Sequence, residues 1–187
     1  YQMASGISDD VESNDSITEI TKARLPWLLI GLIGGLFGAK VIGIFDIEKN
    51  YEMAFFIPLI AAMGGNVGVQ SAAIVVQGLA GGSASITSMW SRLLKELGVA
   101  VVNGTICSLI ILMATYFLGY DMAMSVTVSI SLFAVIIFAA LFGTFVPLTL
   151  EKYDIDPALA TGPFITTVND VLGLFIYFFI GQIILGL

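Results

Sequence analysis

The sequence predicts an all-α membrane protein with five transmembrane helices. Of its 187 residues, 58% are hydrophobic and only 11% are charged, and the mean hydropathy is +1.00. Soluble domains carry about 25% charged residues, so this chain has less than half of the usual share. The apolar residues also gather into five long runs, each near the ~20 residues that a helix needs to cross a bilayer. We therefore expect the lipid bilayer to be the solvent of this chain.

Residues 1–21 form an acidic leader ahead of the first apolar run. Its five carboxylates account for −5 of the net charge of −7, and no Lys or Arg precedes residue 22. The leader has no basic segment followed by an apolar stretch, so it is not a signal peptide. Because the first residue is Tyr1, we expect the sequence to begin inside a longer protein. Residues 22–187 are then the membrane domain.

The five apolar runs place the expected crossings along the chain. The second run is too long for one straight crossing, and Pro58 is followed by the run Gly64–Ser71 (GGNVGVQS). Such a composition interrupts regular helices, so we expect an unwound turn with exposed backbone dipoles. A packing kink satisfied by Asn66 and Gln70 is the alternative. The crossings are expected at Leu25–Phe45, Met53–Gly82, Leu97–Leu118, Met124–Leu150 and Leu159–Leu187.

The connecting segments indicate the orientation. Apolar and charged residues alternate across Ser83–Glu96, a pattern typical of an amphipathic helix on the membrane surface. A cytoplasmic N-terminus leaves Lys49 outside and satisfies the positive-inside rule. The C-terminus is then external. The basic residues on the cytoplasmic side would be Lys22, Arg24, Arg92, Lys95 and Lys152.

Glycines four residues apart predict close approaches between helices. The spacing occurs in Gly31/Gly35, Gly34/Gly38 and Gly64/Gly68. Small residues at this interval let membrane helices pack with their backbones in near contact.

Asp170 is the residue most indicative of function. An ionised carboxylate in the middle of a membrane helix costs about 3 kcal/mol, and the only basic residue within an expected crossing, Lys40, lies near the outer end of the first. Asp170 should therefore face water or an ion; a protonated side chain hydrogen-bonded to a residue such as Asn66 is the alternative. Helical spacing predicts that it belongs to one small or polar stripe along an aqueous path, made of Gly162, Thr166, Asp170, Gly173, Tyr177 and Gly181.

Oxygen ligands of this kind suit hard divalent cations, and magnesium keeps much of its water shell when bound. One carboxylate per chain is a poor cage, so two Asp170 side chains at the twofold axis of a dimer could bind a hydrated ion. The loop Glu151–Asp156 adds three carboxylates that could concentrate cations at the pore mouth.

Several segments together resemble the MgtE family of magnesium channels. These are Gly64–Ser71 with Gln77-Gly78-Leu79-Ala80, then Lys95-Glu96-Leu97-Gly98, Asp156-Pro157-Ala158-Leu159 and Asn169-Asp170-Val171-Leu172-Gly173, in this order across residues 22–187.

The resemblance implies a homodimer of five-helix protomers in the cell (inner or plasma) membrane, with a magnesium pore at the dimer axis. The pore aspartate falls on Asp170, its lining positions on Thr166 and Gly162, and the cytoplasmic-side acidic residue on Asp156. Gly162 stands where better-known members have Asn, and Thr166 replaces a small apolar residue. Cytosolic regulatory domains of the cystathionine-synthase (CBS) type are missing from this sequence; residues 1–21 would be the end of the plug or linker helix that joins them to the pore.

Other classes of function fit less well. With no histidine, serine or zinc hydrolysis of the common kinds is excluded. Aspartyl proteolysis needs two membrane aspartates in a chain or assembly, and the single one in this chain disfavours it. We therefore expect no enzyme and no nucleic-acid partner. A Na⁺- or H⁺-coupled divalent cation exchanger remains the alternative, and a membrane scaffold would leave the polar stripe unexplained.

Overall fold

The computed structural model describes residues 5–8, 10–82 and 89–187, without the side chain of Ala160. Five helices in these ranges are long and apolar enough to cross a membrane, and no strand occurs there. The predicted all-α membrane fold is confirmed. The elements are α1 (Ile17–Ile44), η2 (Ile47–Phe56), α2 (Ile57–Ala80), α3 (Met89–Phe117), α4 (Met122–Lys152), η4 (Pro157–Ala160) and α5 (Pro163–Leu185).

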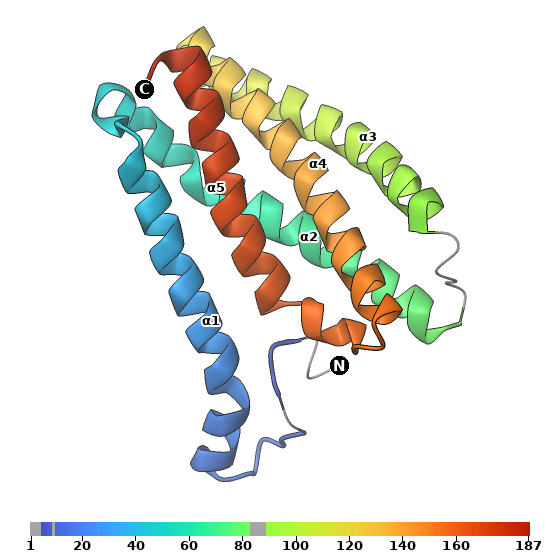
Figure 1. Cartoon of the computed structure of the whole chain (residues 1–187). Helices are drawn as coiled ribbons and strands as arrows, with labels where there is room; N and C mark the ends of the chain where they lie inside the picture. The colour runs from blue at the N-terminus through green and yellow to red at the C-terminus, as the bar shows by residue number, and fades with distance from the viewer. Residues whose placement is uncertain (1–4, 9, 83–88) are drawn as a thin grey trace.

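Helix α4 lies at the centre of the bundle. It packs against α2, α3 and α5, while α1 packs along the far side of α5 (Figure 1). A helix that is apolar all round is suited to burial, and α4 has buried residues along its length, from Met124 to Leu148. Consecutive helices alternate in direction, so the N-terminal end of α1 and the C-terminus lie at opposite ends of the bundle (Figure 1).

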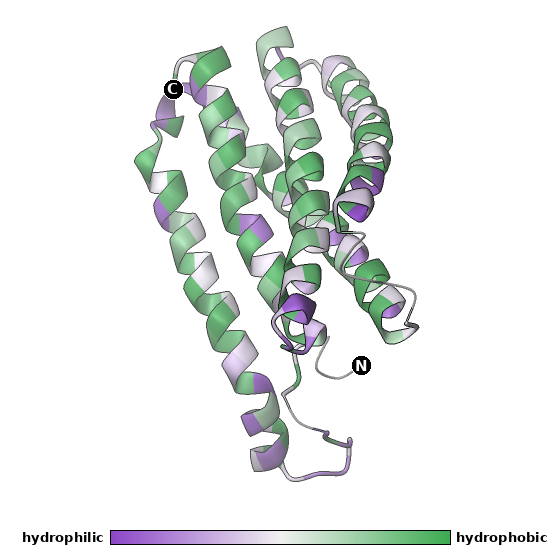
Figure 2. Cartoon of the chain, turned by 45° about the vertical axis from the view of Figure 1, so that its right-hand side comes forward, coloured by the Kyte–Doolittle hydropathy of each residue, from purple (hydrophilic) through white to green (hydrophobic). Residues whose placement is uncertain are grey.

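The hydropathy along the helices agrees with a membrane-spanning bundle. Figure 2 shows mostly hydrophobic residues along the helices and many of the hydrophilic ones near the ends of the bundle, including the end where α1 begins. Helix α1 begins there with a capping box, in which Ser16 Oγ accepts a hydrogen bond from the Glu19 amide and the Glu19 carboxylate accepts one from the Ser16 amide. Two otherwise unpaired amides are thereby satisfied at the helix start.

Helix α2 corrects the prediction for Gly64–Ser71. The helix is continuous from Ile57 to Ala80, so the expected unwound turn is wrong. Pro58 lies in the first turn, where the amide that proline lacks would have had no partner in the helix. The glycines serve packing instead: a Cβ on Gly68 would lie 2.0 Å from the Asn169 side-chain nitrogen, and one on Gly64 would lie 3.0 Å from Val135.

Of the four glycines in α1 that were predicted to pack closely, two do so. A Cβ on Gly34 would lie 1.9 Å from Thr167 Cγ2, and one on Gly38 would lie 3.5 Å from Leu174. Gly31 and Gly35 have nothing within 4 Å of such a Cβ. One face of α1 therefore packs closely on α5, and the neighbouring glycines leave space.

Two further expectations about segment boundaries need correction. Met89–Glu96 is not a separate surface helix but the start of α3; residues 83–88 lie outside the described ranges. The last apolar run is also divided. Gly162 has φ +61°, a conformation that favours glycine, and it separates η4 from α5.

Candidate cation site

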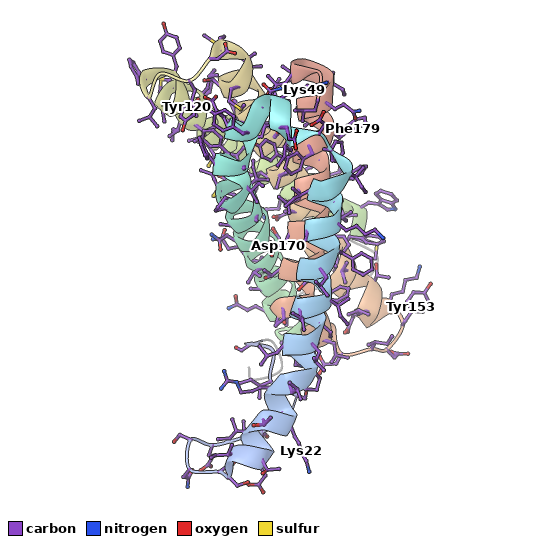
Figure 3. All side chains as sticks on the ribbon, turned by 90° about the vertical axis from the view of Figure 1, so that its left-hand side faces the viewer. Lys22, Lys49, Tyr120, Tyr153, Asp170 and Phe179 are labelled. Atoms are coloured by element: carbon purple, nitrogen blue, oxygen red, sulfur yellow. The ribbon has the colours of Figure 1, made fainter. Side chains whose placement is uncertain are left out.

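Asp170 lies midway along the bundle. In Figure 3 it stands between the level of Lys49 at one end and that of Lys22 at the other. The side chain is half-buried on α5 and makes no hydrogen bond or ion pair with any described residue. The hydrogen bond to Asn66, which was the alternative to a side chain facing water or an ion, is therefore not formed. A charged group in this position is costly unless water or an ion solvates it.

Three pockets meet at Asp170. The largest, of about 1010 Å³, lies between the N-terminal segment, α1 and the start of α5, and it is also lined by Gly162 and Thr166. A second, of about 330 Å³, lies between α2 and α5 and includes Thr166. The third, of about 310 Å³, lies along the glycine face of α1. Asp170 is thus reached from several directions within one protomer.

The groove between α2 and α5 owes its depth to Gly65. A Cβ at this position would lie 3.6 Å from Asp170 Oδ1 and 3.3 Å from Thr166 Cγ2. The exposed side chains of Asn66 and Gln70 line the same groove. Residues with a carboxylate, a hydroxyl and two amides therefore line one groove, and oxygen donors of these kinds suit a hard cation.

The predicted polar stripe is divided by the fold. Thr166 and Asp170 are half-buried beside the pockets, but Gly173, Tyr177 and Gly181 are buried inside the protomer. The Tyr177 hydroxyl donates a hydrogen bond of 2.8 Å to the Met53 carbonyl. The expectation that the whole stripe lines an aqueous path is wrong for its last three members.

The remaining site residues lie toward the end of the bundle where α5 begins. Gly162 is the N-cap of α5 and offers only backbone atoms to the largest pocket. Asp156 is exposed, and its Oδ1 accepts a 2.9 Å hydrogen bond from the Ala158 amide at the start of η4. Asp156 lines none of the three pockets at Asp170. The protomer therefore brings together Asp170, Thr166 and Gly162, but not Asp156.

Sequence reasoning missed three neighbours of Asp170. Arg24 and Trp27 line the largest pocket, but Arg24 forms no ion pair with Asp170. Asn169 is only 1% exposed, and neither polar atom of its amide has a hydrogen-bond partner. For Asn169, the available signal was its position next to Asp170 in a membrane segment. For Arg24 the hydropathy gave no signal, because it did not show that α1 begins eight residues before the expected crossing.

The described part of one protomer has no cluster of acidic, histidine or cysteine ligands. No group of three or more such side chains in these ranges is close enough to hold a metal ion. The arrangement is a single carboxylate with hydroxyl and amide neighbours beside an open groove. It can attract and orient a hydrated cation, but it cannot replace the inner ligands of one.

Residues 57–180 match the family model of MgtE, described as a divalent cation transporter. The magnesium transporter MgtE of Bacillus subtilis is 35% identical over 89% of this chain and 39% of its own length. The namesake of Thermus thermophilus is 31% identical over 96% of the chain and 40% of its length, and that of Enterococcus faecalis is 29% identical over 95% and 40%. The chain thus spans about two fifths of these relatives. With five membrane-length helices and a matching family model over α2 to α5, the chain belongs to the MgtE family of divalent cation transporters.

Proposed function

We propose that this chain forms a pore that conducts Mg²⁺ down its electrochemical gradient, with Asp170 of each protomer at the ion path of a homodimer. The observation that carries the proposal is the half-buried carboxylate of Asp170, which has no partner among the described residues and lines three pockets. The names of the three relatives, all magnesium transporters, support the choice of ion.

Two protomers together would supply the second carboxylate that a single protomer lacks at the site. With the groove between α2 and α5 facing the twofold axis, two Asp170 carboxylates supply the negative field, and Thr166 hydroxyls and Asn66 amides contact the water shell. Magnesium gives up its water reluctantly, so a wide site with second-sphere contacts suits it better than a tight cage. Gly162 contributes no side chain, which leaves the first turn of α5 wide.

The orientation belongs to the same proposal. Lys22, Arg24, Arg92, Lys95 and Lys152 lie where α1 and α3 begin and α2 and α4 end, opposite Lys49. The positive-inside rule assigns that end to the cytoplasm. Asp156, exposed there, would raise the local concentration of cations at the entrance. Cytosolic regulatory domains would connect through residues 1–21.

The test is magnesium flux into proteoliposomes that contain an entrapped fluorescent Mg²⁺ indicator. Asp170→Asn keeps the size of the side chain and removes its charge, so we expect flux to fall at least about a hundredfold, equivalent to roughly 3 kcal/mol. Thr166→Ala should lower flux by only a few-fold, because a hydroxyl provides a weaker field. Glu48→Gln is the matched control, since Glu48 is an exposed carboxylate at the opposite end, and it should conduct like the unchanged chain.

Two outcomes would count against the proposal. Unchanged flux in Asp170→Asn would remove Asp170 from the ion path. Flux that occurs only when a Na⁺ or H⁺ gradient is imposed would replace the channel with a coupled exchanger.

A further inference from the structure

A separate cavity of about 520 Å³ lies between α2, α3 and α4, away from Asp170. It shares Gln70 with the groove described above and otherwise has its own lining. The cavity lies at the end of the bundle where α3 begins, and its entrance carries Arg92 and Lys95. The proposed ion path uses neither of these two side chains.

The positive charges at this cavity are available to a ligand. Arg92 is half-buried and Lys95 is exposed, and neither forms an ion pair within the described part of the chain. The carboxylate of Glu96 also lines the cavity, but it accepts a 2.5 Å hydrogen bond from the Ser71 hydroxyl. The three side chains together leave a net charge of +1, with the negative group held against α2.

The buried wall of the cavity carries a polar group that has no partner among the described residues. Thr144 on α4 is 1% exposed, and its hydroxyl oxygen is buried without a hydrogen bond. Threonines in helices commonly bond the carbonyl four residues earlier, and the Thr144 hydroxyl does not. The exposed residues Asn103 on α3 and Gln70 on α2 also line the cavity. A buried polar group without a partner is costly, so this wall is suited to a ligand that brings oxygen atoms.

The outer rim is apolar and faces the membrane. Ile74 on α2 is 64% exposed and Val99 on α3 is 46% exposed, and both line the cavity. On a transmembrane helix, such exposed aliphatic side chains lie against lipid. The cavity is therefore open sideways to the bilayer, with basic residues near one membrane surface. A ligand that matches both parts is amphiphilic, with an anionic head and an apolar tail.

We propose that this cavity binds an anionic phospholipid from the leaflet on the side where α3 begins. The phosphate lies between Arg92 and Lys95, the glycerol and ester oxygens meet Thr144, Asn103 and Gln70, and one acyl chain leaves past Ile74 and Val99. Basic pockets between transmembrane helices are suited to anionic headgroups, and each nearby Lys or Arg contributes about 1 kcal/mol of attraction. The site depends on the membrane fold and not on the identity of the transported ion.

The proposal is tested by titrating the purified chain in neutral detergent with phosphatidylglycerol or with phosphatidylcholine of the same acyl chains, counting bound lipids by native mass spectrometry. We expect phosphatidylglycerol to bind about tenfold more tightly. Arg92→Gln with Lys95→Gln should abolish this preference. The matched control, Lys22→Gln with Lys152→Gln, removes two exposed charges from the same end outside the cavity and should keep it.

A third variant keeps the proposal testable without changing any charge. Thr144→Val preserves the shape of the side chain and removes the hydroxyl, and we expect phosphatidylglycerol affinity to fall about threefold. Equal affinity for both lipids in the unchanged chain would overturn the proposal, as would an undiminished preference in the Arg92/Lys95 variant or an unchanged phosphatidylglycerol affinity in Thr144→Val. Inorganic phosphate at millimolar concentration should not displace the lipid; displacement would show that the site takes a soluble anion instead.

Discussion

Two polar residues on α5, only seven positions apart, have opposite surroundings. Asp170 opens onto pockets and has no partner among the described residues, whereas Tyr177 is fully buried and bonded to the Met53 carbonyl. The missing partner at Asp170 supports the proposed role with an ion, because a purely structural carboxylate in the membrane would be paired. The hydrogen-bonded hydroxyl of Tyr177 indicates a structural role, in which this residue connects η2 to α5.

Tyr177→Phe should destabilise the protein without removing any apolar contact. The Met53 carbonyl would lose its hydrogen-bond donor from Tyr177, so we expect the free energy of unfolding to fall by about 1–2 kcal/mol. Thermal unfolding in detergent, followed by circular dichroism, measures the change. Tyr51→Phe is the control, because Tyr51 is 64% exposed; if both variants unfolded at the same temperature, the buried bond would contribute nothing.

At the scale of helices, glycine determines how closely α2 approaches its neighbours. A Cβ on Gly143 of α4 would lie 2.4 Å from the Gly68 carbonyl oxygen, which is backbone and cannot rotate away. Pro147, four residues later in α4, also leaves the Gly143 carbonyl without its helical donor. Helices α2 and α4 can thus cross closely only because Gly68 and Gly143 have no side chains. This crossing also positions α2, the helix that lines the groove at Asp170.

Gly143→Ala should therefore push α2 and α4 apart, and we expect a loss of about 1–3 kcal/mol in unfolding free energy, as for other overpacked sites. Gly98→Ala on α3 is the control, because a Cβ there meets nothing within 4 Å. By helix propensity the control should be neutral or stabilising, by up to about 1 kcal/mol. Thermal unfolding of both variants in the same detergent tests this expectation, and an equal midpoint would refute it.

At the scale of the whole molecule, the protomer is one half of the proposed site. It offers one carboxylate beside an open groove between α2 and α5, and the groove carries exposed Ala62, Asn66 and Gln70. A second copy related by a twofold axis would present the same groove to the first, since a symmetric dimer interface uses the same patch on both subunits.

The purified chain should therefore have twice the 19.9 kDa mass of one protomer when measured by light scattering with the detergent contribution subtracted. In a Cys107→Ala background, Ala62→Cys should cross-link between protomers with a short bifunctional reagent. Ile110→Cys, exposed on α3, should not. A monomeric mass, or equal cross-linking at both positions, would exclude a dimer built on this groove.

The sequence by itself determined the membrane class and the number of crossings, and it singled out Asp170 as the candidate site residue. These follow from local quantities: the length of an apolar run, and the cost of placing Asp170 in lipid without a basic partner. The spacing of Gly64 and Gly68 likewise predicted close packing, which the structure confirms.

Only the tertiary structure decided which face of each helix is inside. Lipid is as apolar as a protein core, so hydropathy in a membrane helix does not distinguish a buried side from an exposed one. For this reason the stripe on α5 was predicted as one surface, although Tyr177 packs inside and Asp170 faces a pocket. The sequence also did not show that α2 stays helical through its glycines. That outcome depends on close contacts of Gly68 with Asn169 and Gly143, which lie far away in the sequence.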